Sequence, residues 1–450
     1  MNSQVGGHTE LKISPQPAIA LLPWGNVLED FIDKIGVSLE AFCNEFTGSW
    51  MFGYADALQR VGVRTVLICM SSRIAVPTRF EHAPTGAAIC ILPVPKTYLA
   101  LQRRMVNPYA RTVNQAFGDV SHAARLLLWP LLVVMKESVL YSTTPLKLIA
   151  GEVRRQGCTA ILCQEYEYPR FDICVLLGRM MHLPVFATFQ GGNYQRCWIE
   201  RYLRPRSMRA CNGLIIAAKA EAERVQSRYG IPARKLARIF NPVNLDLWNG
   251  IDREKGRRAL NISFDVQLVV WHGRVSIQQK GLDLLLDAWE RICQQRPGRL
   301  LRLLLIGTGK DADQLQKRIA ALSTQNVVWV NDFVHDRNRM RSYLSAGDIY
   351  AFPSRHEGFP VSPLEAMACG LPVVAADAPG IPDILDGGEA SGGVVVPREN
   401  VTELALALGR LLDNKEWCRE LGKRARHRVE CNFSREVVGQ QLRHFLLKEE

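Results

Sequence analysis

Short apolar runs alternate with longer amphipathic stretches along most of the chain. In its first half, the apolar runs lie at residues 18–22, 64–70, 159–163, 185–188 and 213–217. Each run is short enough for a buried strand, and the stretches between them are long enough for helices. This alternation is typical of a parallel sheet whose strands are joined by helical crossovers, so we predict an α/β domain that begins at Ala18.

The second half repeats the alternation after a turn-rich stretch that reaches Gly250. Its predicted strands lie at residues 267–271, 301–306, 327–330, 349–352, 372–375 and 393–396. Residues 434–447 carry apolar side chains at helical spacing and are predicted to form a closing helix. We therefore predict two Rossmann-like domains, at 18–245 and 246–430, with a flexible tail at 1–17 and a C-terminal helix at 431–450 that crosses back to the first domain.

Composition and charge narrow the class of protein without choosing a partner. Of 450 residues, 47% are hydrophobic and 22% are charged, which excludes a disordered chain and a collagen-like repeat. The 56 Lys and Arg residues outnumber the 44 Asp and Glu residues, and the net charge of +12 favours an anionic partner. That partner is a nucleic acid, a phosphorylated substrate or an acidic membrane surface.

The cysteines and the longest apolar run bear on where the protein works. The 12 cysteines are scattered singly with no CxxC pair, and we find no secretory signal, so we expect reduced core cysteines in a cytoplasmic protein. The longest apolar run, at 126–135, is about half of the roughly 20 residues needed to span a bilayer. We therefore expect no transmembrane anchor.

The most informative segment, at 353–372, reads PSRHEGFPVSPLEAMACGLP, with seven residues between Glu357 and Glu365. It follows a predicted strand and leads into a predicted helix, and ligands of open α/β sheets bind at such strand ends. The backbone N–H groups of a Gly-Phe loop and the positive end of the helix dipole suit a sugar diphosphate.

This segment resembles the E-x7-E signature of the retaining, two-domain (GT-B) glycosyltransferases, and of their family 4 (glycosyl transferases group 1) in particular. The resemblance implies an α/β fold of GT-B architecture, in which two Rossmann-like domains with parallel sheets face each other across a cleft. It further implies that Glu365 accepts hydrogen bonds from the ribose of a nucleotide and that Glu357 contacts the donor sugar in catalysis. The neighbouring donor-binding positions are then Gly358, Phe359, Pro360 and Leu364.

A second element, WHGRVSIQQKG at 271–281, carries Arg274 and Lys280. It is similar to the family's G-x-R…K-G element, in which the two cations clamp the diphosphate and act in catalysis. The reaction needs such a clamp because the leaving group develops negative charge and the sequence offers no metal motif to neutralise it. We assign Asp311 and Asp313, which spell DxD, to the N-terminal end of a helix, and predict neither a metal nor a cofactor.

Two further segments extend the resemblance. Residues 327–335 are similar to the segment that holds the nucleotide base through backbone contacts, and Val334 is the candidate donor-binding residue there. In the first domain, FTGSWMF at 46–52 occupies the place of a loop that meets the donor phosphates, with Gly48 as its turn residue.

The segment TFQGGN at 188–193 departs from the family pattern. Many relatives carry a His near the donor sugar at the position that Gln190 occupies here. We take Gln190 and Asn193 as candidates for contact with the acceptor or the donor sugar. A polar loop bounded by glycines is the alternative interpretation.

Much of the positive charge falls on the first domain. Residues 96–155 hold nine basic and three acidic residues, a net of +6 (9 − 3), and five arginines cluster at 196–209. Beside the apolar run at 126–135, this charge favours an anionic membrane leaflet and a lipid-linked acceptor. A solvated basic face over a buried helix is the alternative. Nucleic acid is not expected, because no binding motif accompanies the charge.

Together these features predict a retaining, metal-independent glycosyltransferase. It would move a sugar from a nucleotide-diphosphate-sugar donor to a hydroxyl acceptor such as a lipid-linked or polysaccharide glycan. The expected location is the cytoplasm, including the inner face of the plasma membrane. Two alternatives stay open: a nucleotide-sugar epimerase of the same fold, and a non-catalytic protein that binds sugar nucleotides.

Overall fold

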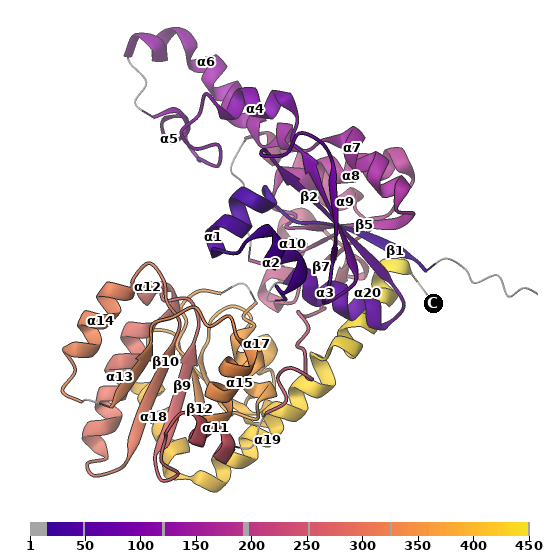
Figure 1. The fold of residues 1–450 in the computed structure, drawn as a ribbon. Coiled ribbons are helices and arrows are strands. Elements are labelled where there is room, and N and C mark those ends of the chain that lie inside the picture. The colour runs from indigo at the N-terminus through magenta and orange to yellow at the C-terminus, as the bar shows by residue number, and fades with distance from the viewer. Residues whose placement is uncertain are drawn as a thin grey trace, which may run out of the picture.

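The computed structural model describes residues 16–47, 50–118, 122–191, 198–250, 253–324, 326–357 and 359–448. These residues form two α/β domains (Figure 1). Three of the candidate site residues, Gly48, Asn193 and Gly358, lie outside the described residues.

The first domain is built on an eight-stranded sheet with the order β3-β4-β2-β1-β5-β6-β7-β8. Its strands are β1 (Ala18–Leu22), β2 (Arg64–Ser71), β3 (Thr78–His82), β4 (Ala87–Pro93), β5 (Cys158–Gln164), β6 (Val185–Thr188), β7 (Gly213–Ile215) and β8 (Leu236–Ala237). The five predicted strands are confirmed, within one or two residues at their ends. The edge pair β3 and β4 is antiparallel and was not predicted, and every other neighbouring pair is parallel.

The second domain is built on a six-stranded parallel sheet with the order β11-β10-β9-β12-β13-β14. Its strands are β9 (Gln267–His272), β10 (Leu301–Ile306), β11 (Val327–Val330), β12 (Ile349–Phe352), β13 (Val373–Ala376) and β14 (Gly393–Val396). Successive side chains of β9 enter two different cores: Leu268 and Val270 pack on one face, and Val269 and Trp271 on the other. This explains why its sequence is apolar throughout instead of alternating.

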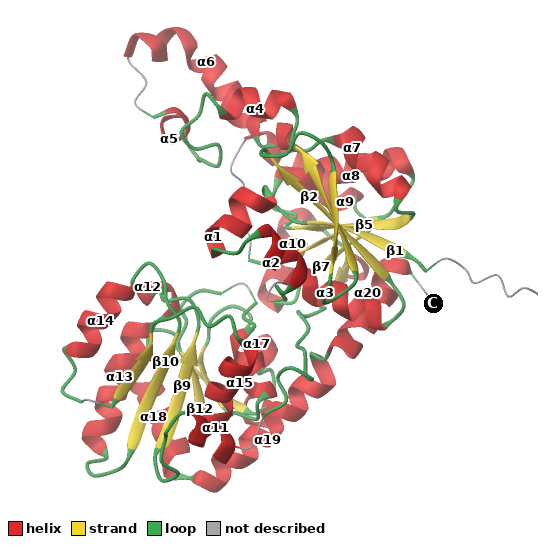
Figure 2. Ribbon diagram, viewed as in Figure 1, coloured by secondary structure: helices red, strands yellow, loops and turns green. Residues whose placement is uncertain are grey.

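Helices cover both faces of each sheet (Figure 2). In the first domain they are α1 (Asp33–Ile35), α2 (Leu39–Asn44), α3 (Trp50–Arg60), α4 (Lys96–Gln102), α5 (Val113–Phe117), α6 (His122–Val139), α7 (Leu146–Arg155), α8 (Pro169–Met181), α9 (Trp198–Ala210) and α10 (Lys219–Tyr229). Those that follow are α11 (Arg253–Ala259), α12 (Ile277–Lys280), α13 (Leu282–Gln295), α14 (Ala312–Ala320), α15 (Arg337–Ala346), α16 (Ser362–Ala368), α17 (Ile381–Ile384), α18 (Val401–Asp413), α19 (Lys415–Asn432) and α20 (Arg435–Leu447).

The chain returns from the second domain to the first through α19 and α20 (Figure 1). Helix α20 packs against α3, and its side chains Val438, Leu442 and Leu446 are buried in the core of the first domain. The two helices approach closely at Gly439, where a Cβ atom would lie 2.2 Å from the carbonyl oxygen of Ala57. The core of the first domain is therefore completed by residues that follow the whole second domain.

Candidate active site

The predicted donor-binding residues gather where the parallel strands of the second domain end. The loop after β9 carries Arg274 and leads into α12, and the loop after β12 carries Glu357 and leads into α16. Contacts to the first domain lie at the same end of the sheet. Asp383, on α17 beyond β13, accepts a hydrogen bond from the backbone N–H of Lys219 at 3.0 Å and pairs with Arg238. The carboxyl ends of the strands therefore face the first domain, as ligand-binding sheets of this type require.

Lys280 and Glu357 form an ion pair. The Lys280 Nζ lies 2.7 Å from Glu357 Oε1, and both side chains are largely buried. Lys280 is the last residue of α12, and Gly281 ends that helix with a φ of 64°. A Cβ on Gly281 would lie 2.0 Å from the carbonyl oxygen of Pro353, so only glycine lets α12 approach the loop that carries Glu357.

Arg274 lies on the loop that leads into α12, but it contacts a different residue from Lys280. Its guanidinium donates to Gln279 Oε1 at 3.2 Å, and in the described part of the chain it pairs with no carboxylate. Gln279 in turn contacts the carbonyl oxygen of His356 at 3.4 Å. The exposed Arg274 charge is therefore available to an anion, whereas the Lys280 charge is balanced by Glu357.

Glu365 is held by two groups that the sequence analysis missed. His272, the last residue of β9, places its Nε2 2.9 Å from one carboxylate oxygen, and Arg337 lies 3.7 Å from the other. The His272 side chain is buried, and its Nδ1 has no hydrogen-bond partner among the residues that the structure describes. The sequence signal was a lone polar residue at the end of the apolar strand QLVVWH.

Tyr350 connects His272 to the start of α16 through its hydroxyl group. Its hydroxyl donates to the carbonyl oxygen of His272 at 3.2 Å and also contacts the Ser362 side chain at the start of α16. Burial raises the pKa of the Tyr350 hydroxyl well above its ordinary value, so it stays a neutral donor. The bond joins β12 to the residue that orients Glu365.

The other predicted donor-binding residues lie around these groups. Phe359 stacks on Phe240, which lies in the segment at 238–250 that leads from β8 to the second domain (the linking segment), with ring centroids 5.1 Å apart. Pro360 and Leu364 are buried, and Val334 is half-buried against the core of the second domain. The Leu364 side chain thus packs inside the domain, and any contact that Leu364 makes with a donor comes from its backbone.

Gln190 is engaged within the protein. Its side-chain amide bonds to that of Asn241 in the linking segment and donates to Thr188 Oγ1 at 2.9 Å, while its backbone N–H donates to Glu165 at 2.7 Å. Tyr54 also shares hydrogen bonds with Thr188 and Gln190. The structure therefore gives Gln190 a connecting role between β6 and the linking segment, and its contact with a sugar stays a prediction.

The DxD sequence lies where a helix begins. Asp311 accepts a hydrogen bond from the backbone N–H of Ile277 at 2.9 Å, which supports the start of α12, and Asp313 lies in the first turn of α14. Across the described residues, no three His, Cys, Asp or Glu side chains group together as metal ligands. Metal-independent transfer stays a prediction.

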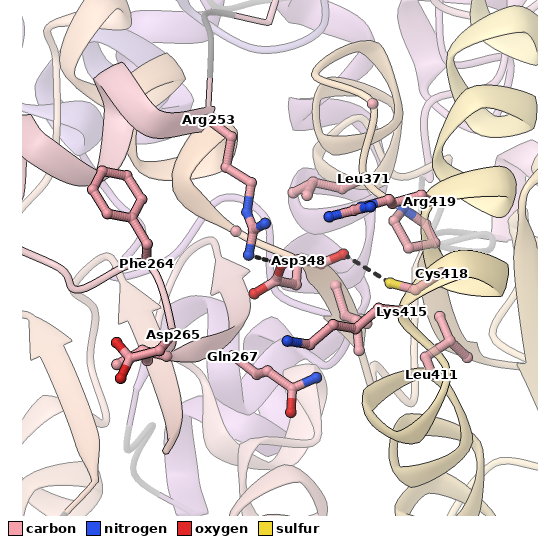
Figure 3. A pocket seen from close by; sticks show the side chains of 15 residues that line it. Arg253, Phe264, Asp265, Gln267, Asp348, Leu371, Leu411, Lys415, Cys418 and Arg419 are labelled. Atoms are coloured by element: carbon pink, nitrogen blue, oxygen red, sulfur yellow. Dashed lines mark hydrogen bonds and ion pairs between the residues drawn. The ribbon is translucent and has the colours of Figure 1, made fainter. Parts of the chain in front are cut away.

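A cavity of about 220 Å³ lies at the opposite end of the second sheet (Figure 3). Arg253 reaches over Asp348 there, and the Cys418 thiol donates to the Asp348 carbonyl oxygen at 3.4 Å. Burial raises the pKa of Cys418 to about 12, so the thiol is unreactive. Arg257 also pairs with Asp348 at 2.7 Å. These bonds hold α11 and α19 to the amino ends of the strands, far from the predicted donor site.

Comparison with known proteins gives matches in sequence and in fold. Residues 266–414 match the family model "Glycosyl transferases group 1". The chain is 30% identical over 205 residues to a GDP-mannose-dependent monoacylated alpha-(1-6)-phosphatidylinositol monomannoside mannosyltransferase of Corynebacterium glutamicum, covering 44% of this chain and 51% of that protein. It is 25% identical over 248 residues to the alpha-D-kanosaminyltransferase of Streptomyces kanamyceticus, covering 54% and 61%. The matches thus span about half to three-fifths of these relatives.

Solved structures match over nearly the whole chain. Sucrose-phosphate synthase of Thermosynechococcus elongatus superposes with a TM-score of 0.63 at 18% identity, covering 96% of this chain and 98% of that one. HepE of Anabaena in complex with UDP superposes with a TM-score of 0.64 at 15% identity, covering 96% and 100%. The chain therefore has the GT-B glycosyltransferase fold, as the resemblance implied. Within its second domain, residues 266–414 are the part that matches the glycosyl transferases group 1 model.

Proposed function

We propose that the protein is a retaining glycosyltransferase that takes a sugar from a nucleotide-diphosphate sugar and attaches it to a hydroxyl acceptor. One observation supports this above the others: Arg274, Lys280, Glu357 and Glu365 come together at the carboxyl end of one parallel sheet. The named activities of the relatives support the same class of reaction.

Each group has a role in this proposal. Glu365, oriented by His272, accepts hydrogen bonds from the ribose hydroxyls. Arg274 and Lys280 lie against the diphosphate and stabilise the charge that develops as the leaving group departs. In the free protein, Glu357 balances the charge of Lys280. When the donor binds, Glu357 contacts the sugar, and the two phosphates of the donor replace the single carboxylate beside Lys280.

The chemical step follows from that arrangement. The bond between the anomeric carbon and the diphosphate oxygen breaks, and the acceptor oxygen bonds to the same face of the sugar. The proton of the acceptor hydroxyl passes to the departing phosphate oxygen, which balances charge without a metal or a protein nucleophile. Attack on the same face gives retention.

The proposed acceptor is a hydroxyl of a lipid-linked or polysaccharide glycan, bound between the two domains. The basic character of the first domain supports an acceptor that lies against that domain. A cytoplasmic location, including the inner face of the plasma membrane, is part of the same proposal. An epimerase is less compatible with the site, because His272 is buried and bonded to Glu365 instead of facing a sugar.

The test combines binding and turnover. Thermal unfolding is followed with a panel of nucleoside diphosphates and nucleotide sugars, because a ligand that binds the native state raises the melting temperature. We expect one base to be selected, the shift to be lost in Glu365→Gln, and transfer to be abolished in Lys280→Ala. Lys317→Ala, an exposed lysine on α14, is the matched control. Unchanged turnover in Lys280→Ala would refute the clamp, and binding without any transfer would favour the non-catalytic alternative.

A further inference from the structure

Helix α6 extends from the first domain, away from the second (Figure 1). The side chains that the structure describes on this helix are those at 127–139, and the first of them, at 127–134 (the exposed half of α6), include large apolar ones that face solvent. Between 41% and 82% of each is exposed, and they are Leu127, Leu128, Trp129, Leu131 and Val134. Soluble monomers rarely expose apolar side chains of this size side by side, so the group marks an interaction surface.

The other half of α6 fixes the helix to the domain. Met135 and Val139 are buried, and the adjacent Lys136 and Glu137 form a buried ion pair at 2.7 Å. The exposed half is thus the continuation of an anchored helix, so its apolar side chains are held in a defined position.

All exposed charges around α6 are positive in the described part of residues 96–157. The segments of α4 and α5, which pack against α6, contribute the exposed cations Lys96, Arg103, Arg104 and Arg111. The acidic side chains described in that range, Glu137 and Glu152, are buried and paired with Lys136 and Arg79. Among the described residues of this range, no exposed anion therefore screens the cations.

An aromatic pair on α9 adjoins the anchored half of α6. The backbone N–H of Trp198 donates to the Glu137 carboxylate, and the rings of Trp198 and Tyr202 meet edge to face at 6.1 Å. Their exposed fractions are 50% and 60%, and the exposed Arg201 lies between them in sequence. Tryptophan and tyrosine favour the level of lipid headgroups, where their apolar rings and polar atoms are both satisfied.

We propose that the exposed half of α6, the aromatic pair on α9 and the surrounding cations form a docking surface for an anionic lipid bilayer. The helix would lie in the interface with its apolar side chains among the acyl chains and the cations at the headgroups. No helix within the described residues is long and apolar enough to cross a membrane. The surface is thus suited to peripheral attachment, and, resting on the proposed function, it would bring the acceptor side of the enzyme to a lipid-linked glycan.

A second copy of the chain fits this surface less well. A two-fold interface brings the same patch of each subunit together. The cations of α4 and α5 would then face their own copies without a described exposed anion between them. A bilayer with acidic headgroups complements the same charges.

The experiment is co-sedimentation of the full chain with vesicles of phosphatidylcholine, with and without phosphatidylglycerol. We expect binding only to the vesicles that contain phosphatidylglycerol. The apolar variant combines Leu127→Ser, Trp129→Ser and Leu131→Ser, and should lose at least tenfold in binding. Its matched control combines Phe264→Ser, Leu300→Ser and Leu406→Ser, three exposed apolar positions of the second domain, and should bind like the wild type.

A variant that lacks three of the cations tests the electrostatic part of the binding separately. Arg103→Gln, Arg104→Gln and Arg111→Gln together should weaken binding by about fivefold for each cation removed. The control, Lys317→Gln with Arg318→Gln and Lys415→Gln, removes as many exposed cations from the second domain and should have no effect.

The outcomes separate this inference from the proposed function. Wild-type protein that stays in solution with anionic vesicles would overturn the docking surface, as would equal sedimentation of the apolar variant. A dimer that the apolar variant dissociates, without vesicle binding, would assign the surface to a second copy instead. Nucleotide-induced stabilisation is measured on the same variants, and we expect it unchanged. If vesicles bind but no nucleotide does, the transferase proposal fails and the docking surface stands.

Discussion

The side-chain amides of Gln190 and Asn241 bind each other through both of their polar atoms. Asn241 Nδ2 donates to Gln190 Oε1 at 2.8 Å, and Gln190 Nε2 donates to Asn241 Oδ1 at 3.2 Å. Gln190 follows β6, and Asn241 lies in the segment that leads to the second domain. The pair thus ties the first sheet to the linking segment.

Removing either amide should destabilise the first domain. In Gln190→Ala the buried Asn241 amide loses both of its bonds to Gln190, and in Asn241→Ala the half-buried Gln190 amide keeps only its bond to Thr188, so each variant should cost about 1–3 kcal/mol of unfolding free energy. The double variant should cost less than the sum of the two, because both lose the same bonds. Urea unfolding followed by tryptophan fluorescence measures this, with the exposed Gln314→Ala as control. Additive effects would show that the two amides act independently.

His272 should matter for nucleotide binding through Glu365. The variant His272→Phe keeps a ring of similar shape but removes the 2.9 Å bond to the carboxylate. We expect the Kd for the selected nucleoside diphosphate to rise about tenfold or more, as for loss of a hydrogen bond to a charged group. Titration calorimetry gives the value. Tyr350→Phe, which keeps that bond, should have a smaller effect, and equal losses in both variants would contradict the role given to His272.

Gly281 should tolerate no side chain. In Gly281→Ala, the new Cβ would lie 2.0 Å from the Pro353 carbonyl oxygen, so α12 must move away from the loop that carries Glu357. We expect transfer to fall at least tenfold and the melting temperature to drop. The control is Gly298→Ala, which has a similarly positive φ but no atom within 4 Å of the added Cβ. If both variants behave alike, backbone strain and not the collision is the cause.

The ion pair of Arg79 and Glu152 predicts a pH-dependent stability. The Arg79 guanidinium, 2.7 Å from the buried carboxylate, holds the pKa of Glu152 below its ordinary value of 4.5. A carboxyl with a lowered pKa in the folded state stabilises the fold above the unfolded pKa, and that stability is lost as the pH falls through the folded pKa.

Arg79→Met should therefore lower the unfolding free energy at neutral pH, because it removes the ion pair of the buried Glu152 carboxylate. The difference from wild type should shrink as the pH falls below 4.5, where Glu152 becomes protonated in the unfolded chain. Urea unfolding at a series of pH values measures both. A difference that stays constant with pH would mean that Arg79 contributes packing and not charge.

Most of the strands could be predicted because burial on both faces leaves a plain sequence signal. The run QLVVW, for example, became β9. The edge strand β3 (Thr78–His82) was missed because its sequence TRFEH is mostly polar and partly exposed, so the sequence shows no apolar run. Such a strand is defined by its pairing with β4 rather than by its own composition.

The candidate site also contains residues that could be predicted from the sequence and contacts that could not. Arg274, Lys280, Glu357 and Glu365 could be named because the segments at 271–281 and 353–372 resemble motifs of a known family. The bond between His272 and Glu365 could not, because the two residues are 93 positions apart and meet only when β9 and β12 pair. The hydrogen bonds between Gln190 and Asn241 likewise could not be predicted, because they depend on how the linking segment passes β6.

The return of α20 to the first domain has a consequence for synthesis of the protein. The core that receives Val438, Leu442 and Leu446 is otherwise built from residues made before the second domain. At the usual elongation rate, residues 246–434 take about 10–40 s to emerge. During that interval the surface of α3 that later contacts α20 has no cover from its own chain, so nascent first domains are vulnerable to association with one another until translation passes the second domain.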